Sequence, residues 1–152
     1  MKVENLLAVK SSRSTVTISP DAPLADAAKL LSENNVGLAV VVGAHGELLG
    51  VFSERDIVRA VAEAAAAATS TTVADLMTAK VVTCGPGDDV RDVIRTMGEG
   101  GIRHMPVVSD GRSVEVISKT DVLAYMIKEL DPEERVAVLQ TVLEGTAGVP
   151  WI

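Results

Sequence analysis

The strongest constraint on this sequence is that the chain repeats itself. Shifted by 66 positions, residues 16–42 align with residues 82–108, and seven aligned residues are identical. Apolar residues recur with the helical spacing i, i+3, i+4, i+7 in both copies, at Leu24, Ala27, Ala28 and Leu31 and at Val90, Val93, Ile94 and Met97. Because such self-similarity is the mark of a duplicated structural unit, we expect two similar units.

Each copy predicts the element order β-α-β-β-α. Apolar runs predict strands at 15–18, 38–42 and 48–52 in the first copy, and at 81–84, 104–108 and 114–117 in the second. The helix after the first strand ends at a flexible pair, Asn34-Asn35 or Gly100-Gly101, as a left-handed cap requires. A second helix is expected to follow the last strand, beginning at Ser53 or Ser118.

The repeat also sets the expected boundaries. We predict a first repeat at 1–63, a linker at 64–72 and a second repeat at 73–128. In the linker, an alanine run is expected to continue the preceding helix until the Thr/Ser run breaks it. A C-terminal helix and tail would occupy 129–152, with a helix start at Asp131, Pro132 and Glu134 and an apolar stripe at Val136, Leu139 and Leu143.

Composition narrows the class of protein. The 152 residues include 47% hydrophobic but only 2% aromatic residues, so aliphatic side chains must form the core. The net charge of −7 disfavours nucleic-acid binding, although it allows a small anionic ligand. Cys84 is the only cysteine, and no secretion signal or membrane span is apparent. We therefore expect a cytoplasmic protein without nucleic-acid or membrane partners.

The junction between the last strand and the second helix is repeated as "VFSERDIV" (51–58) and "VISKTDVL" (116–123). Ser53 with Asp56, and Ser118 with Asp121, have the spacing of capping boxes that satisfy helix-start amides. A second interpretation is ligand binding, because a helix N-terminus attracts phosphate and a carboxylate can accept from both hydroxyls of a ribose. Capping and binding are compatible, and the duplication favours binding.

The ordered combination of these segments resembles a tandem pair of cystathionine-β-synthase (CBS) domains, a Bateman module. The segments are "VTISPDAPLADAAKLL", "GVFSERDIVRA", "VADLMTAKVVTCGP" and "GGIRHMPVV" followed by "VISKTDVL", and the resemblance covers roughly residues 3–128. It implies an α/β (α+β) fold in which two pseudo-symmetric repeats pack through their sheets. It also implies two clefts that hold an adenosine-containing ligand, such as AMP, ADP, ATP, NAD or S-adenosylmethionine.

The resemblance assigns expected roles to residues of both clefts. Asp56 and Asp121 would bind ribose. Phosphate would contact hydroxyl, basic or imidazole groups at Ser53, Arg55, Ser118, Lys119, Thr120, Arg103 and His104. Adenine would enter an apolar pocket, where main-chain N–H and C=O groups would recognise the base. The residues of this pocket would be Val16, Thr17, Ile18, Val36, Val82, Thr83, Cys84 and Ile102. Each aliphatic residue among these could equally be ordinary sheet core, Arg103 a solvated charge and His104 a packing residue.

The two copies differ where a ligand would bind. The first has Gly37-Leu38 where the second has Arg103-His104, and the second has Glu115 where the first has Gly50. Glu115 also departs from the glycine usual in the family, so it is expected to crowd or reorient the second cleft. We therefore predict non-equivalent sites.

These observations predict a regulatory module that senses adenine nucleotides, AMP being the first candidate, with no catalysis, no metal and a homodimeric assembly. An enzyme is the first alternative, using Cys84, His45 and His104 or the Asp56/Asp121 pair, but the sequence has no nucleophile elbow, P-loop or metal-ligand cluster. A ligand-independent dimerisation or scaffold module is the second. Its contacts would be helix faces around Ile57, Val58 and Val61 and around Val122, Leu123 and Met126, with the C-terminal stripe or Trp151 meeting a client protein.

Overall fold

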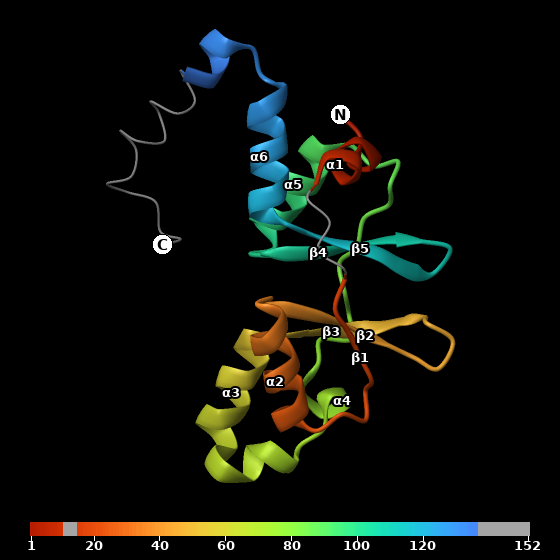
Figure 1. Ribbon diagram of the computed structural model, residues 1–152, viewed down its shortest axis with the longest axis vertical. Coiled ribbons are helices and arrows are strands. Elements are labelled where there is room, and N and C mark those ends of the chain that lie inside the picture. Colours follow the sequence, from red (N-terminus) through yellow and green to blue (C-terminus); the bar gives the residue numbers. More distant parts are fainter. Residues whose placement is uncertain (11–14, 137–152) are drawn as a thin grey trace.

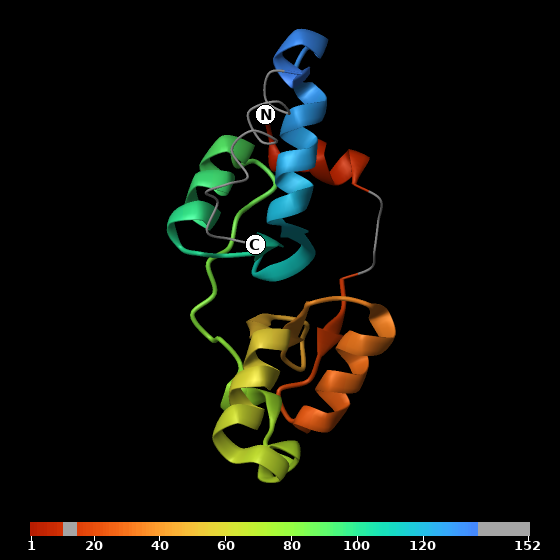
Figure 2. The same cartoon turned by 90° about the vertical axis from the view of Figure 1, so that its left-hand side faces the viewer.

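The chain folds into two units that face each other through their sheets (Figure 1). The computed structural model describes residues 1–10 and 15–136. In each unit, helices cover the outer face of a small sheet, and the inner faces of the two sheets meet at the centre of the molecule (Figures 1 and 2). This arrangement confirms the expected mixed α/β fold of two repeats packed through their sheets.

The first unit follows the predicted order. It contains β1 (Thr17–Ile18), α2 (Leu24–Asn34), β2 (Leu38–Val42), β3 (Leu48–Ser53) and α3 (Glu54–Ala64). The sheet order is β1-β2-β3, with β1 parallel to β2 and β2 antiparallel to β3. Buried aliphatic side chains of α2 pack against the sheet, where Phe52 is fully buried.

The second unit has one strand fewer than predicted. It contains α5 (Val90–Glu99), β4 (His104–Ser109), β5 (Arg112–Ser118) and α6 (Lys119–Glu129), and β4 pairs antiparallel with β5. The expected strand at 81–84 is wrong, because only Cys84 pairs with β4, through an isolated parallel bridge to Val107.

Pro106 explains the lost strand. In the first unit, the amide of Val40 donates to the carbonyl of Val16 at 2.9 Å, next to β1. Pro106 occupies the position equivalent to Val40, and proline has no N–H to donate to Val82, the residue equivalent to Val16. The pairing is therefore confined to Cys84, whose N–H donates to Pro106 O at 3.1 Å and whose carbonyl accepts from Val108 N at 2.8 Å.

The helices α2 and α5 end as the sequence predicts. Asn35 has φ 51° and Gly101 has φ 61°, so each pair supplies one left-handed residue. These two residues are equivalent under the 66-residue shift. The tight ends direct the chain into β2 and β4, at the meeting point of the two units.

The units exchange their leading helices. The first helix of the chain, α1 (Val3–Val9), buries Val3 and Leu6 in the core of the second unit. Conversely, α4 (Val73–Leu76) buries Val73 in the core of the first unit. Each folded unit therefore includes a helix from the other predicted repeat.

The linker differs from its predicted form. Helix α3 ends at Ala64, because Ala65 has φ 47° and turns the chain, and a 3₁₀ helix follows at Ala65–Ser70. The alanine run therefore continues α3 only through Ala64. The 3₁₀ helix instead buries Ala68 in the core of the first unit.

The C-terminal helix begins where predicted. The Asp131 carboxylate accepts hydrogen bonds from the amides of Glu133 and Glu134, both at 2.9 Å, and residues 132–136 are helical. Val136 is exposed, whereas Leu139, Leu143 and Trp151 lie outside the described residues. Across residues 1–10 and 15–136, no helix combines the length and apolarity needed to cross a membrane.

Candidate functional site

Both strand-to-helix junctions form the predicted capping boxes. Asp56 Oδ2 accepts from the amide of Ser53 at 2.8 Å and from its hydroxyl at 3.0 Å. Asp121 Oδ2 accepts from the amide of Ser118 at 2.8 Å, and the amide of Asp121 donates to Ser118 Oγ at 3.0 Å. Each carboxylate therefore stabilises the start of its helix, α3 or α6.

The two carboxylates differ in accessibility. The Asp56 side chain is 6% exposed, and a second contact, to Arg59 Nη1 at 3.5 Å, uses its other oxygen. The Asp121 side chain is 32% exposed, and its contacts to described residues all use Oδ2. A ligand approaching from the space between the units can therefore reach the Asp121 carboxylate more readily than that of Asp56.

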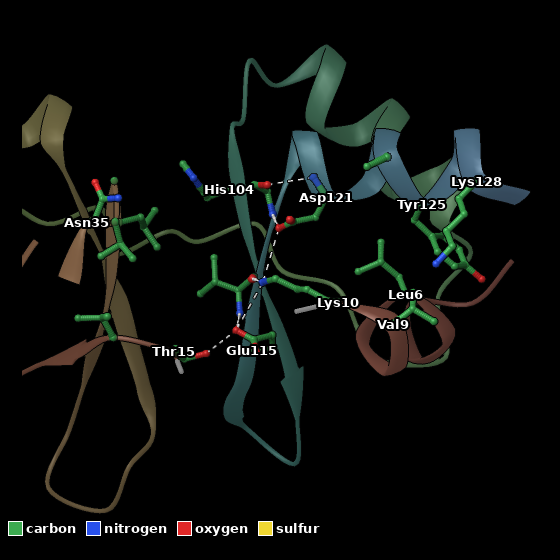
Figure 3. A pocket seen from close by; sticks show the side chains of 17 residues that line it. Leu6, Val9, Lys10, Thr15, Asn35, His104, Glu115, Asp121, Tyr125 and Lys128 are labelled. Carbon is green, nitrogen blue, oxygen red and sulfur yellow. Dashed lines mark hydrogen bonds and ion pairs between the residues drawn. The ribbon is translucent and has the colours of Figure 1, made fainter. Parts of the chain in front are cut away.

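Asp121 lies on a cavity of about 580 Å³ between the two units. The first unit contributes the segments around β1 and β2, the second contributes β5 and α6, and α1 closes one side (Figure 3). Its apolar lining includes Leu6, Val9, Val16, Val36, Leu38, Val116, Ala124 and Tyr125. Its polar lining includes Lys10, Thr15, Asn35, His104, Glu115, Ser118, Asp121 and Lys128. Apolar walls with a few polar groups at one side are typical of small-molecule sites.

A charge cluster occupies one wall of this cavity. The Lys10 ammonium lies 3.5 Å from Asp121 Oδ2 and 3.7 Å from Glu115 Oε1, and it donates to the carbonyl of Val116 (Figure 3). Thr15 Oγ1 donates to Glu115 Oε1 at 2.8 Å. All three charged side chains are less than one third exposed, so water screens them only in part.

The Asp121 carboxyl is held in its charged form. Burial raises the pKa of Asp121, but hydrogen bonds from the amide and side chain of Ser118 and the charge of Lys10 outweigh burial, so its pKa lies below the usual value. An ionised carboxylate is the state that accepts hydrogen bonds from ligand hydroxyls.

His104 lies where the two units meet. Burial lowers the pKa of His104, although the nearby carboxylates of Asp121 and Glu54 oppose that effect. The imidazole therefore favours the neutral form at pH 7. His104 also lines a second cavity of about 520 Å³, on the side of α2 and α3, together with Glu54 and Ile57.

Gly50 and Glu115, which occupy matching positions in the two repeats, have different surroundings. A Cβ on Gly50 would lie 2.8 Å from Thr78 O and 2.9 Å from Met77 Sδ. Glycine at position 50 therefore lets residues 77 and 78 lie against β3. There the backbones of Val51 and Thr78 exchange hydrogen bonds of 3.0 and 2.9 Å. In the second repeat, Glu115 occupies the matching position, and the Lys10 side chain reaches β5 instead.

Five of the predicted site residues line the cavity, namely Val16, Val36, His104, Ser118 and Asp121. The other residues of the second repeat lie outside its lining: Arg103, Lys119, Thr120, Val82, Thr83, Cys84 and Ile102. The same holds for the remaining residues of the first repeat, Ser53, Arg55, Asp56, Thr17 and Ile18. Ile18 and Cys84 are buried in the two cores. The main-chain groups of Cys84 are used by β4 and are not available to read a base.

Sequence reasoning missed several cavity residues, above all Lys10. The sequence shows Glu115 in place of glycine but not its ion pair, because Lys10 reaches Glu115 only through the exchange of α1 between the units. The spacing of Tyr125 and Lys128 from Asp121, one and two helical turns, could have placed them on the same face of α6.

The groups considered for catalysis are not assembled. Burial and the nearby Asp88 raise the pKa of Cys84 to about 11, which opposes formation of a thiolate. His45 is exposed in the turn between β2 and β3. Among the described residues, no group of three or more His, Cys, Asp or Glu side chains could hold a metal ion.

Comparisons with known proteins agree with this architecture. The family model of the CBS domain matches residues 6–63 and 73–128. The crystal structure of the CBS-domain containing protein ATU1752 from Agrobacterium tumefaciens is 36% identical, with a TM-score of 0.77 over 83% of this chain and 99% of that chain. The CBS domain pair of protein MJ0100, in complex with 5′-methylthioadenosine and S-adenosyl-L-methionine, is 25% identical, with a TM-score of 0.74 over 86% of this chain and 98% of that one.

This chain spans less than half the length of two of the curated relatives that it matches. MJ1225 of Methanocaldococcus jannaschii is 33% identical over 111 residues, which are 73% of this chain and 39% of that protein. The L-aspartate semialdehyde sulfurtransferase of Methanosarcina acetivorans is 35% identical over 112 residues, which are 74% of this chain and 22% of the enzyme. The similarity to the enzyme is thus restricted to a minor part of its length.

Proposed function

The chain belongs to the CBS-domain family, and from this premise we propose that it is a regulatory module that binds an adenosine-containing small molecule between its repeats, without catalysis. The observation that carries the proposal is the cavity at Asp121. Its volume of about 580 Å³ lies within the usual range for small-molecule sites, roughly 300–1,000 Å³. A CBS domain pair of similar structure is known in complex with two adenosyl compounds.

In this proposal, the ribose binds at Asp121. The helix cap uses Oδ2, so Oδ1 is available to accept from a ribose hydroxyl. Adenine would pack between Val16 and Val36, which contribute apolar surface from the first unit. The 5′ substituent would then extend toward His104 and the start of α6, where Ser118 lines the cavity. AMP, ADP, ATP, NAD and S-adenosylmethionine are the candidate ligands.

Regulation follows from the location of the cavity. A ligand that contacts both units favours whichever relative arrangement allows both sets of contacts. A partner protein could read that arrangement, and we include a homodimer and a client protein in the proposal. Exposed Val58 and Val61 on α3 support a protein contact, and they also support the scaffold alternative, in which no ligand is required.

The matched variants D121N and D56N test the ligand site. Both substitutions neutralise a capping carboxylate, but only Asp121 lines the cavity. We expect D121N to weaken binding of adenosine compounds by at least about tenfold in calorimetry, since hydrogen bonds to charged groups contribute about 1.5–3 kcal/mol. D56N should bind as the parent does.

Thermal melting with adenosine, S-adenosylmethionine, AMP, ATP and NAD separates the two functions. Binding to the folded state must raise the melting temperature. If none of these compounds raises it, the ligand proposal fails and the scaffold alternative stands. Equal loss of affinity in D121N and D56N would instead point to helix capping as the sole role of the carboxylates.

A further inference from the structure

The ionisable side chains that line the cavity balance one another. Lys10 and Lys128 carry positive charge, whereas Glu115 and Asp121 carry negative charge. His104 favours its neutral form because burial lowers its pKa. The cavity therefore has no surplus of positive charge to attract a phosphate group, unlike sites in which Arg or Lys clusters receive polyanions.

Lys10 is already engaged within the protein. Its ammonium contacts oxygens of Asp121, Glu115 and Val116, and its side chain is 15% exposed. A phosphate that approached Lys10 would also meet the two carboxylates that hold it. Like charges in a partly desolvated site repel strongly, because water screens them poorly.

Glu115 is the residue that creates this balance. Its carboxylate is 19% exposed and is fixed by Thr15 Oγ1 at 2.8 Å and by the amide of Val116 at 2.9 Å. With glycine at this position, as at Gly50, Lys10 would face Asp121 alone and the cavity would have a positive surplus. The single Glu115 side chain thus changes the charge of the whole site.

We propose that the Lys10–Glu115 pair makes this cavity selective for adenosyl compounds whose 5′ substituent carries no net negative charge. Nucleosides, 5′-thioethers and sulfonium compounds fit this class, whereas AMP, ADP and ATP are disfavoured. The inference rests on the proposed function and narrows its ligand class. Glu115 acts as a specificity-determining residue, and Asp121 remains the residue that binds ribose.

Adenosine and AMP form the minimal pair of probes, because they differ only in the 5′ phosphate. Calorimetry on the full chain at constant ionic strength gives the ratio of the AMP to the adenosine dissociation constant. We expect the parent protein to bind AMP at least about tenfold more weakly than adenosine, with S-adenosylmethionine binding at least as well as adenosine. A tenfold ratio corresponds to about 1.4 kcal/mol.

The isosteric variant E115Q should lower the AMP-to-adenosine ratio by about tenfold, since it removes one negative charge while its amide oxygen can still accept from Thr15. The variant K10M should raise the ratio, because it leaves two carboxylates against the single positive charge of Lys128. E99Q removes an exposed carboxylate at the end of α5 and should leave the ratio unchanged. Melting curves establish that each variant is folded.

The outcomes separate this inference from the proposed function. If the parent binds adenosine and AMP equally, or if E115Q leaves the ratio at its parental value, charge selection is wrong while adenosine binding at Asp121 stands. If the parent binds no adenosyl probe, both fail.

Discussion

Gly50 and Glu115 occupy matching positions, yet they give the two repeats opposite surroundings. Glycine permits the backbone at Thr78 to lie against β3, where a Cβ would come within 2.8 Å of its carbonyl oxygen. In the second repeat, the Glu115 carboxylate instead lies 3.7 Å from the Lys10 ammonium, which also contacts Asp121 at 3.5 Å. The two duplicated aspartates therefore lie in different surroundings: Asp121 lines the cavity beside this charge cluster, whereas Asp56 is buried.

His104 should make stability depend on pH. Burial lowers its pKa in the folded protein, so the unfolded chain binds more protons between the folded pKa and the unfolded value of about 6.5. The free energy of unfolding should therefore fall as pH falls below about 7, and H104Q should remove part of this dependence. Urea unfolding at pH 7.5 and 5.5 measures how much the free energy of unfolding changes with pH in the parent and in H104Q.

The second histidine of the chain provides the control for that experiment. His45 is exposed in a turn, away from the contact between the units, so H45Q should retain the parental pH dependence. If the free energy of unfolding of H104Q depends on pH as strongly as that of the parent, burial of His104 does not affect proton binding. Asp121, Glu54, Arg103 and Lys10 influence the same imidazole, and H104Q leaves all four charges in place.

At the scale of elements, the exchanged helix α1 belongs energetically to the second unit. Leu6 is 1% exposed in that core, whereas Val9, one turn on, is 55% exposed. We expect L6A to lower the free energy of unfolding by about 2–5 kcal/mol, as for other buried leucines, and V9A to change it by less than about 0.5 kcal/mol. Chemical denaturation measures both values.

Hydrogen exchange then locates the damage caused by L6A. Exchange should accelerate in β4, β5, α5 and α6 more than in the first unit, although Leu6 lies in the first repeat of the sequence. V73A provides the mirror experiment, because Val73 is buried in the first core. Faster exchange around β1–β3 in L6A would mean that the exchanged packing does not govern local stability.

The elements also show why some features could be predicted from the sequence and others could not. Helical spacing identified α2 and α5, and the cap positions Asn35 and Gly101 were visible as flexible pairs. The lost strand at 81–84 was readable in principle from Pro106, once its pairing to Val82 is considered. The pairing of Lys10 with Glu115 could not be predicted from the sequence. The two residues are 105 positions apart, and only the exchange of α1 between the units brings them together.

At the scale of the molecule, the two units share one cavity and leave other apolar residues uncovered. The cavity lies between the two units. Val58 and Val61 of α3 do not line it, and their side chains are 68% and 51% exposed. Ligand binding and protein association can therefore use separate surfaces, which a regulatory module requires if a partner is to respond to the ligand.

The proposed homodimer should depend on the exposed face of α3. The double variant V58E/V61E places two charges where apolar side chains would be buried, and it should raise the dimer dissociation constant by at least about 100-fold. Val114, 50% exposed on β5, gives the matched control V114E, which should remain dimeric. Sedimentation velocity over a range of concentrations distinguishes these outcomes. A parent chain that sediments as a monomer throughout excludes the homodimer, whereas a dimeric V58E/V61E variant moves its interface to another surface.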